Sequence, residues 1–229
     1  MPRNHEGSAA PSLSPTAASA FLENSVVRPV CPGRSAQGCR RPIDRYTAPM
    51  SKRVLCLLFT GFEEIEALTP VDLLRRAGAE VVIASLTSEL LVTGRSNVTV
   101  RADATLADVV GQPFDLLLLP GGPGVKAVRA DGRAATLAQQ FVTAGRTVAA
   151  ICAAPSVLAD AGLLAERRYT AHFSLNEELP MAMAGERVVE DGPIITSRGA
   201  GTALDFGLAL VRHLFDDARA AEVSRAVMA

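Results

Sequence analysis

Short apolar runs alternate with amphipathic segments from Arg53 onward, and this alternation is the feature that most constrains the fold. The runs Arg53–Phe59 and Leu116–Leu119 are continuously apolar, which is typical of strands buried on both faces of a parallel sheet. Between them, Glu64–Ala77 has the pattern of a helix that ends at Gly78. Strands that alternate with helices predict a single-domain, doubly wound α/β sandwich with a mainly parallel sheet.

The remaining segments follow the same rule. Further strands are expected at 80–85, 98–102 (a hairpin or edge ribbon), 147–151, 169–171 and 194–197, and further helices at 134–144, at 153–161 and, as a pair, from Thr202 onward. A hairpin is expected to turn at Asp191-Gly192. In sheets of this kind, sites gather at the carboxyl ends of the strands, so residues that follow each strand are the candidates for function.

The composition changes near Met50. Residues 1–49 contain half of the fourteen prolines, six arginines, no lysine and no periodic apolar pattern, which is typical of disordered sequence. Three explanations remain open: a disordered extension, an organellar transit peptide, or a start codon assigned too far upstream. Acidic residues such as Glu6 and Glu23 fit a transit peptide less well. We expect an extension that contributes nothing to the fold, and a folded domain at 50–229.

Charge and cysteine usage limit the possible partners. The chain has 23 basic and 24 acidic side chains in 229 residues, which gives no electrostatic footprint for nucleic acid or for an anionic membrane. No apolar run approaches the length that spans a bilayer. Cys31, Cys39, Cys56 and Cys152 show no Cys-x-x-Cys pair and no metal-ligand spacing, so we expect reduced thiols, no metal and no cofactor. The expected location is the cytoplasm, or an organelle if residues 1–49 are a transit peptide.

Cys152 is the leading candidate for a reactive residue. It stands between an apolar strand, Thr147–Ile151, and the helix that follows, where a side chain occupies a strained elbow. Ala150 and Ala154 are small enough for the chain to pass closely on both sides. The amides that begin the helix favour a thiolate, which predicts a lowered pKa. The competing interpretation is a buried structural cysteine, because free cysteine behaves as a small hydrophobe.

Other strand ends offer polar partners for this thiol. Glu66 lies in an apolar context after the first strand and would be protonated or share a hydrogen bond with a thiolate, although a surface position is also open. Gly121 and Gly122 follow Leu116–Leu119, and their amides could donate to an oxyanion, or could simply form a turn. His172 follows 169–171, where a general base for a cysteine would stand, although a lone histidine is often structural.

Five motifs in order resemble the ThiJ/PfpI superfamily, which has a class I glutamine amidotransferase-like domain. They fit the branch that contains the Parkinson-disease-linked protein deglycase and the bacterial ThiJ-type proteins. The matching segments are Thr60–Glu66 with Pro70–Gly78, Leu119–Gly122, Ala149–Pro155 and Ser197–Thr202, preceded by Thr196. The resemblance covers nearly all of 52–229 and none of 1–49.

The resemblance implies a flavodoxin-like homodimer in which Cys152 is the reactive, oxidation-sensitive thiol and Glu66 is the acid that hydrogen-bonds it. Gly122 and Ala153 match positions whose amides line an oxyanion pocket, and His172 matches a histidine that some members have. Protease-like members carry a histidine directly after the cysteine, where this chain has Ala153, which argues against a peptidase. Amidotransfer fits poorly, because His213-Leu-Phe215 does not supply the His-x-Glu pair that it needs.

The function implied is that of a cofactor-independent glyoxalase (a lyase) or deglycase (a hydrolase) that uses Cys152. Its substrates would be methylglyoxal, glyoxal or their early glycation adducts. The alternative is a non-catalytic redox sensor or holdase chaperone that acts through oxidation of the same cysteine. His172 distinguishes the two hypotheses, because a sensor needs no proton shuttle.

Overall fold

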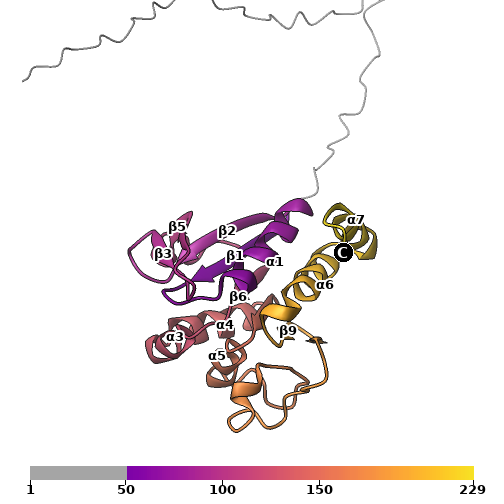
Figure 1. The fold of residues 1–229 in the computed structure, drawn as a ribbon. Helices are drawn as coiled ribbons and strands as arrows, with labels where there is room; N and C mark the ends of the chain where they lie inside the picture. Colours follow the sequence, from indigo (N-terminus) through magenta and orange to yellow (C-terminus); the bar gives the residue numbers. More distant parts are fainter. Residues whose placement is uncertain (1–50) are drawn as a thin grey trace, which may run out of the picture. The chain divides into compact units, whose positions relative to one another are not determined.

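A seven-stranded sheet forms the centre of the molecule in the computed structural model, which describes residues 51–229 (Figure 1). The expectations for residues 1–49, including Cys31 and Cys39, lie outside this range. The strands are β1 (Arg53–Leu58), β2 (Glu80–Ser85), β5 (Ala104–Thr105), β6 (Leu116–Leu119), β7 (Thr147–Ile151), β8 (Val188–Asp191) and β9 (Ile194–Ser197). Their order across the sheet is β5-β2-β1-β6-β7-β9-β8, and β8, which pairs antiparallel with β9, is the exception in an otherwise parallel sheet. The predicted sandwich is confirmed.

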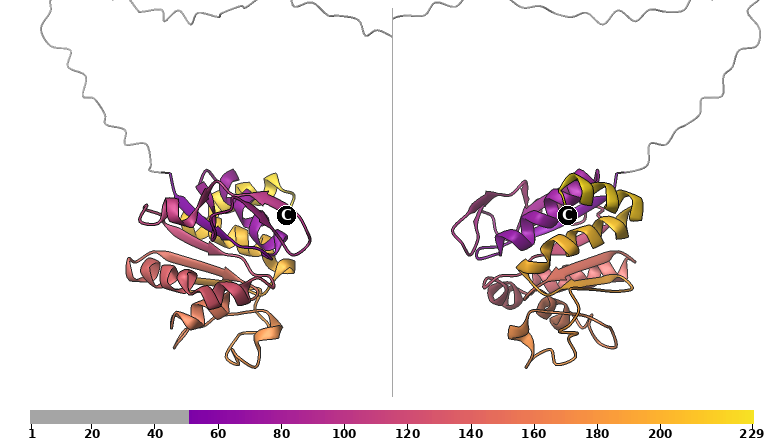
Figure 2. Two further views of the ribbon diagram at one scale, coloured as in Figure 1. Left: turned by 90° about the vertical axis from the view of Figure 1, so that its left-hand side faces the viewer. Right: turned by 45° about the vertical axis from the view of Figure 1, so that its right-hand side comes forward.

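Helices cover both faces of this sheet. The helices are α1 (Glu64–Arg76), α2 (Leu106–Val109), α3 (Val125–Asp131), α4 (Arg133–Thr143), α5 (Pro155–Asp160), α6 (Ala203–Leu214) and α7 (Asp217–Ala226). The views of Figure 2 place α1, α6 and α7 on one face and α3, α4 and α5 on the other. A separate two-stranded hairpin, β3 (Leu91–Thr93) with β4 (Thr99–Arg101), corresponds to the ribbon expected near 98–102.

Burial explains why the apolar runs become strands. All four leucines of β6 are at most 1% exposed, and Cys56 in β1 is fully buried, as expected of strands covered on both faces. The neighbours β1, β6, β7 and β9 occupy the centre of the sheet, and the three parallel pairings among them align their carboxyl ends along one edge. The segments that follow these four strands, which include Thr60, Pro120, Cys152 and Arg198, therefore all lie at that edge.

The structure corrects two expected elements and adds a helix, α3. No strand forms at Tyr169–Ala171, because the amide of Thr170 donates to the side-chain oxygen of Thr196 (2.9 Å) rather than to a neighbouring strand's backbone. The helix expected over 153–161 is shorter, since α5 begins at Pro155, a residue that suits a first helical turn. Finally, α3 was not expected, and Gly132 in a left-handed conformation (φ 78°) separates it from α4.

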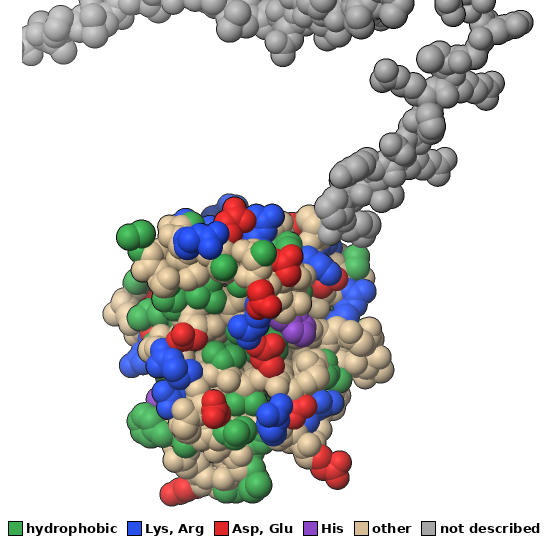
Figure 3. Space-filling model, turned by 90° about the vertical axis from the view of Figure 1, so that its right-hand side faces the viewer, with side chains coloured by type: hydrophobic (Ala, Val, Ile, Leu, Met, Phe, Trp, Pro, Cys, Tyr) green, Lys and Arg blue, Asp and Glu red, His purple; other side chains and the backbone are tan. Residues whose placement is uncertain are grey.

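The surface carries acidic and basic side chains interspersed with one another on the face shown in Figure 3. Many of them pair, for example Arg76 with Asp72 and Arg187 with Asp205. None of the helices within residues 51–229 is long and apolar enough to cross a membrane.

Candidate functional site

Cys152 occupies a strained elbow directly after β7. Its φ of 66° lies in the left-handed region, which a cysteine rarely adopts. Two backbone hydrogen bonds hold it there: its amide donates to the carbonyl of Ser197 (2.9 Å), and its carbonyl accepts from the amide of His172 (2.9 Å). The thiol is half-buried. The sequence-based expectation of a strained strand-to-helix turn at this cysteine is confirmed.

Glycines allow the β6 loop to pass against this elbow. A Cβ atom on Gly121 would lie 2.6 Å from the Cβ of Cys152 and 2.6 Å from Oε2 of Glu66. Gly122 has a φ of 109°, and a Cβ there would lie 2.4 Å from the carbonyl oxygen of Gly61. Neither position accepts a side chain, so the loop backbone itself lines the site.

The amides of this loop divide between two partners. The N–H of Gly121 donates to Oε2 of Glu66 (3.0 Å), so it holds the carboxyl group. The amides of Gly122 and Ala153 lie near the Cys152 sulfur and favour its ionised form. Gly122 and Ala153 therefore face the sulfur, whereas Gly121 positions Glu66.

Glu66 is buried beside the thiol in the first turns of α1, with 1% of its surface exposed. Its own amide donates to the carboxylate of Glu63 (2.8 Å), which is the N-cap of α1. Burial raises the pKa of the Glu66 carboxyl from 4.5 to about 7, and the hydrogen bond with Cys152 opposes the shift. The charge of Glu63 raises the pKa further, while the amides of Gly121 and Ala200 lower it. The surface position is excluded.

The pKa of Cys152 corrects the sequence-based expectation. Burial, followed by the charge and hydrogen bond of Glu66, raises the pKa of the thiol to about 12, and the amides of Gly122 and Ala153 only partly offset this. Both opposing effects of Glu66 require its ionised form. The two groups therefore share a single negative charge: near pH 7 one proton leaves the pair, and the other is held between the sulfur and the carboxylate.

His172 stands close to this pair and begins the short 3₁₀ helix η1 (Phe173–Leu175). Its Nδ1 accepts from the amide of Ser174 (3.3 Å) and lies 2.9 Å from the Ser174 hydroxyl. Because an amide can only donate, Nδ1 is the acceptor, and the neutral ring carries its proton on Nε2. His172 is therefore arranged to donate a hydrogen bond rather than to accept a proton.

The loop after β9 closes the site from the other side. A Cβ atom on Gly199 would lie 3.5 Å from Cδ2 of His172, 3.7 Å from Oε1 of Glu66 and 4.0 Å from the Cys152 sulfur. Gly199 thus adjoins all three candidate side chains. The hydroxyl of Thr202 ties the loop down by contacts with the Ser197 hydroxyl (2.6 Å) and the Gly199 carbonyl (2.8 Å), and it makes no hydrogen bond that caps α6.

An arginine joins the segments on either side of the site. Arg129 of α3 pairs with both oxygens of Asp160, at the end of α5, and with Glu178, which follows η1. The pairing with Asp160 is bidentate, at 2.7 and 2.8 Å. The helix behind Cys152 and the segment that carries His172 therefore share one cation.

Sequence reasoning found Cys152, Glu66 and His172, and the structure brings them together. Sequence reasoning did not identify Gly199, whose only signal is that it is a glycine soon after a strand, or Glu63, which caps α1 and accepts a hydrogen bond from the amide of Glu66. Within residues 51–229, no group of three or more His, Cys, Asp or Glu side chains is placed to hold a metal ion.

Fold and site together define a flavodoxin-like α/β protein whose strand-to-helix elbow carries a cysteine beside a buried acid. The model of the DJ-1/PfpI family matches residues 52–213. The chain belongs to this family.

Similarity to individual relatives supports this family assignment. The chain is 36% identical to protein dj-1beta of Drosophila melanogaster over 183 residues, which cover 78% of this chain and 98% of the relative. The crystal structure of that Drosophila protein superimposes with a TM-score of 0.74 over the same shares of the two chains. The chain is also 34% identical to the deglycase PfpI of Pyrococcus furiosus, over 65% of this chain and 91% of the relative. A structure of oxidized Toxoplasma gondii DJ-1, 31% identical, gives a TM-score of 0.74 and covers 78% of this chain and 98% of its own.

The raised pKa of Glu66 makes stability depend on pH. A native carboxyl that binds its proton more tightly than the unfolded chain contributes stability below pH 4.5, and this contribution is lost as pH rises through about 7. Compared with Glu66→Gln, the wild-type protein should lose up to about 3 kcal/mol of unfolding free energy over this range. Urea unfolding of both proteins between pH 4 and 8 measures the difference, and parallel pH curves would contradict the assignment.

The position of Gly199 predicts that one methyl group obstructs the site without disturbing the fold. In Gly199→Ala the new contacts are ordinary van der Waals distances, so the unfolding free energy should change by no more than about 0.5 kcal/mol. Alkylation of Cys152 by iodoacetamide, followed by peptide mass spectrometry, should slow by about tenfold or more. Gly201→Ala, whose Cβ would meet nothing within 4 Å, is the control. Equal rates in the two variants would refute this placement.

Proposed function

We propose that the protein is a cofactor-independent, cysteine-dependent glyoxalase that converts small 2-oxoaldehydes such as methylglyoxal to 2-hydroxy acids. The observation that carries this proposal is the left-handed elbow of Cys152, which directs the sulfur at Glu66 and at the amides of Gly122 and Ala153. Relatives named deglycases support enzymatic chemistry on aldehydes or their adducts in this family.

The first step is addition of the Cys152 sulfur to the aldehyde carbon. As the carbon–sulfur bond forms, the proton held between the sulfur and Glu66 passes to the carboxylate, so the thiol needs no prior ionisation. The aldehyde oxygen becomes the oxyanion of a hemithioacetal. The amides of Gly122 and Ala153, which lie near the sulfur and favour its ionised form, would be the donors that stabilise this charge.

Glu66 next returns this proton to the oxyanion, which becomes the hydroxyl of the hemithioacetal, and Glu66 is again a carboxylate. The second step moves hydrogen from the former aldehyde carbon to the ketone carbon. Glu66, with a pKa of about 7, suits a group that both accepts and returns a proton near neutral pH. An enediol forms and collapses to a thioester, in which the ketone has become a hydroxyl. Nε2–H of His172 is the donor available to the substrate oxygens. Water then hydrolyses the thioester, and the net reaction adds one water to methylglyoxal to give lactate.

A redox sensor that acts through the same cysteine is the second candidate, and the oxidized form of the Toxoplasma relative favours it. Two equivalents of peroxide would convert the Cys152 thiol to a sulfinate, with Glu66 as its hydrogen-bond partner. This function needs neither Nε2–H of His172 nor space for a substrate beside Gly199.

Lactate production separates the two candidates. The full-length chain should form D- or L-lactate from methylglyoxal without glutathione, and Cys152→Ser should lower kcat/KM by at least about a thousandfold. His172→Ala should lower it by about a hundredfold or more. Lys126→Ala, an exposed change on α3, is the control. Absence of wild-type turnover, with peroxide still oxidising Cys152 in His172→Ala at the wild-type rate, would instead support the sensor.

The expected homodimer finds support at the start of α1. Oε1 of Glu64 accepts from the amide of Ser96 (2.8 Å), but its buried Oε2 has no hydrogen-bond partner within the described part of the chain. Ile65 and Val98, which flank this contact in sequence, are 53% and 49% exposed. A second copy that covers both apolar side chains and donates to Oε2 would satisfy this surface.

Sedimentation equilibrium tests this surface. The wild-type chain should sediment as a dimer, and Ile65→Lys should weaken the dimer by about tenfold or more in dissociation constant because it places a charge among buried apolar groups. Val110→Lys changes a residue that is 60% exposed on α2's C-cap and should leave the dimer intact. A monomeric wild-type chain, or the same effect in both variants, would count against the proposal.

A further inference from the structure

A small cavity lies beside the site and shares His172 with it. It has a volume of about 160 Å³ and is lined by Ala171, His172, Phe173, Asn176, Ala184 and Arg198. Since a water molecule occupies roughly 30 Å³ in the liquid, the cavity holds about five groups of that size. His172 belongs both to this cavity and to the site, where its ring adjoins Gly199. The cavity is therefore placed to receive the remainder of a molecule whose reacting carbon meets Cys152.

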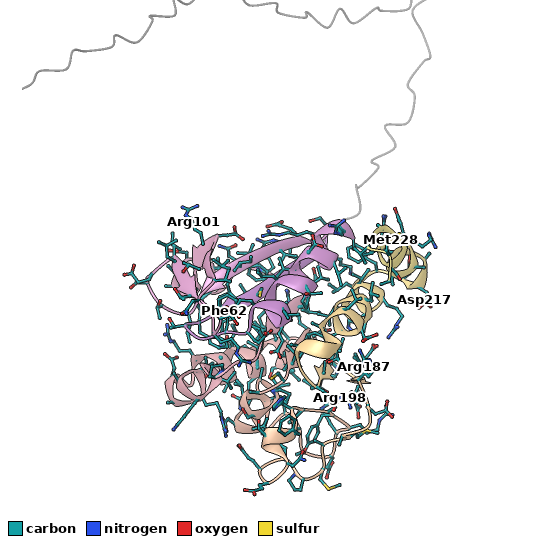
Figure 4. All side chains as sticks on the ribbon, in the orientation of Figure 1. Phe62, Arg101, Arg187, Arg198, Asp217 and Met228 are labelled. Carbon is teal, nitrogen blue, oxygen red and sulfur yellow. The ribbon has the colours of Figure 1, made fainter. Side chains whose placement is uncertain are left out.

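Arg198 supplies the charge in this cavity. Figure 4 shows it near the start of α6, above the loops that precede β8. Its Nη1 donates to the carbonyl oxygen of Ala184 (2.8 Å), which holds the guanidinium in place. No carboxylate of residues 51–229 lies within ion-pair distance of it, whereas nearby Arg187 pairs with Asp205. Arg198 as a residue is half-buried, and its guanidinium, anchored by this one hydrogen bond, keeps further donors free to recognise an anion.

We propose that Arg198 binds the carboxylate of a 2-oxoaldehyde that carries an acidic tail, and thereby selects such substrates over neutral ones. The planar donor fork of a guanidinium matches a carboxylate, and the amide of Asn176 and the ring of Phe173 form the remaining wall. The reaction is the one proposed above, on which this inference rests: the aldehyde carbon bonds to sulfur, and the carboxylate takes no part in bond making. Arg198 is accordingly a specificity-determining residue.

Two matched substrates test the selection. Wild-type protein should act on 4,5-dioxopentanoate with a higher kcat/KM than on its methyl ester, which has a similar size and no charge. In Arg198→Gln the ratio of kcat/KM for the acid to kcat/KM for the ester should fall by about tenfold or more, because one charge-assisted contact is lost. Arg198→Lys, which keeps the charge without the fork, should recover part of it. Arg212→Gln, which removes an exposed, ion-paired arginine from α6, should leave the ratio unchanged.

A second readout does not require turnover. Iodoacetate and iodoacetamide alkylate sulfur with loss of iodide, and the carboxymethyl and carbamoylmethyl groups that they transfer are similar in size but differ in charge. Peptide mass spectrometry follows the rates at Cys152. The iodoacetate rate divided by the iodoacetamide rate should fall by roughly threefold or more in Arg198→Gln and should not change in Arg212→Gln. If Arg198→Gln lowers the ratio of the iodoacetate rate to the iodoacetamide rate, and the wild-type protein turns over neither aldehyde, the anion site is supported and the glyoxalase proposal is refuted. An unchanged ratio in Arg198→Gln, or equal losses in both variants, would overturn the role of Arg198.

Discussion

The left-handed backbone at Cys152 is the constraint on which the rest of the site depends. A residue other than glycine in this region costs about 1–3 kcal/mol, so the conformation persists only because the surroundings impose it. Here the carbonyl of Ser197 and the amide of His172 take up both backbone groups of the cysteine. Strand β9 and the segment before η1 therefore determine where the sulfur points. The same two segments supply Gly199 and the imidazole, so the nucleophile and its surroundings are positioned by shared contacts.

Charge is the second constraint. A buried carboxyl and a half-buried thiol cannot both ionise in so dry an environment, and the pair consequently holds one negative charge near neutral pH. The nearby amides of Gly121, Gly122, Ala153 and Ala200 compensate that charge wherever it resides. This arrangement is suited to chemistry in which Glu66 takes a proton from sulfur and later carries one between two carbons of a substrate, because the protein need not reorganise as the charge moves.

Much of the fold and of the candidate site could be predicted from the sequence, and the features that could not be predicted have physical causes. Apolar runs such as Leu116–Leu119 identify buried strands because their pattern is local. The glycines beside Cys152 and the small residues around it are also local signals. Tyr169–Ala171 was assigned to a strand because its pattern fits one, but the amide of Thr170 bonds to a side chain from β9. The pKa of Cys152 was expected to be low because helix amides were visible in the sequence, whereas the burial that outweighs them is a property of the assembled fold.

The ion pairs that Arg129 makes with Asp160 and Glu178 join two sides of the site that are held in place by different kinds of contact. Cys152 extends from β7, whose residues are fully buried or nearly so, and moving it requires disruption of the central sheet. The segment from His172 to Glu178 has exposed or half-buried side chains, and it is tied to α3 by the partly exposed ion pair of Glu178 with Arg129. Such contacts weaken as ionic strength rises, while apolar burial does not. The nucleophile thus belongs to the most protected layer of the molecule, whereas the wall opposite it, although bonded to the Cys152 carbonyl through the His172 amide, is held to α3 by a contact that salt weakens.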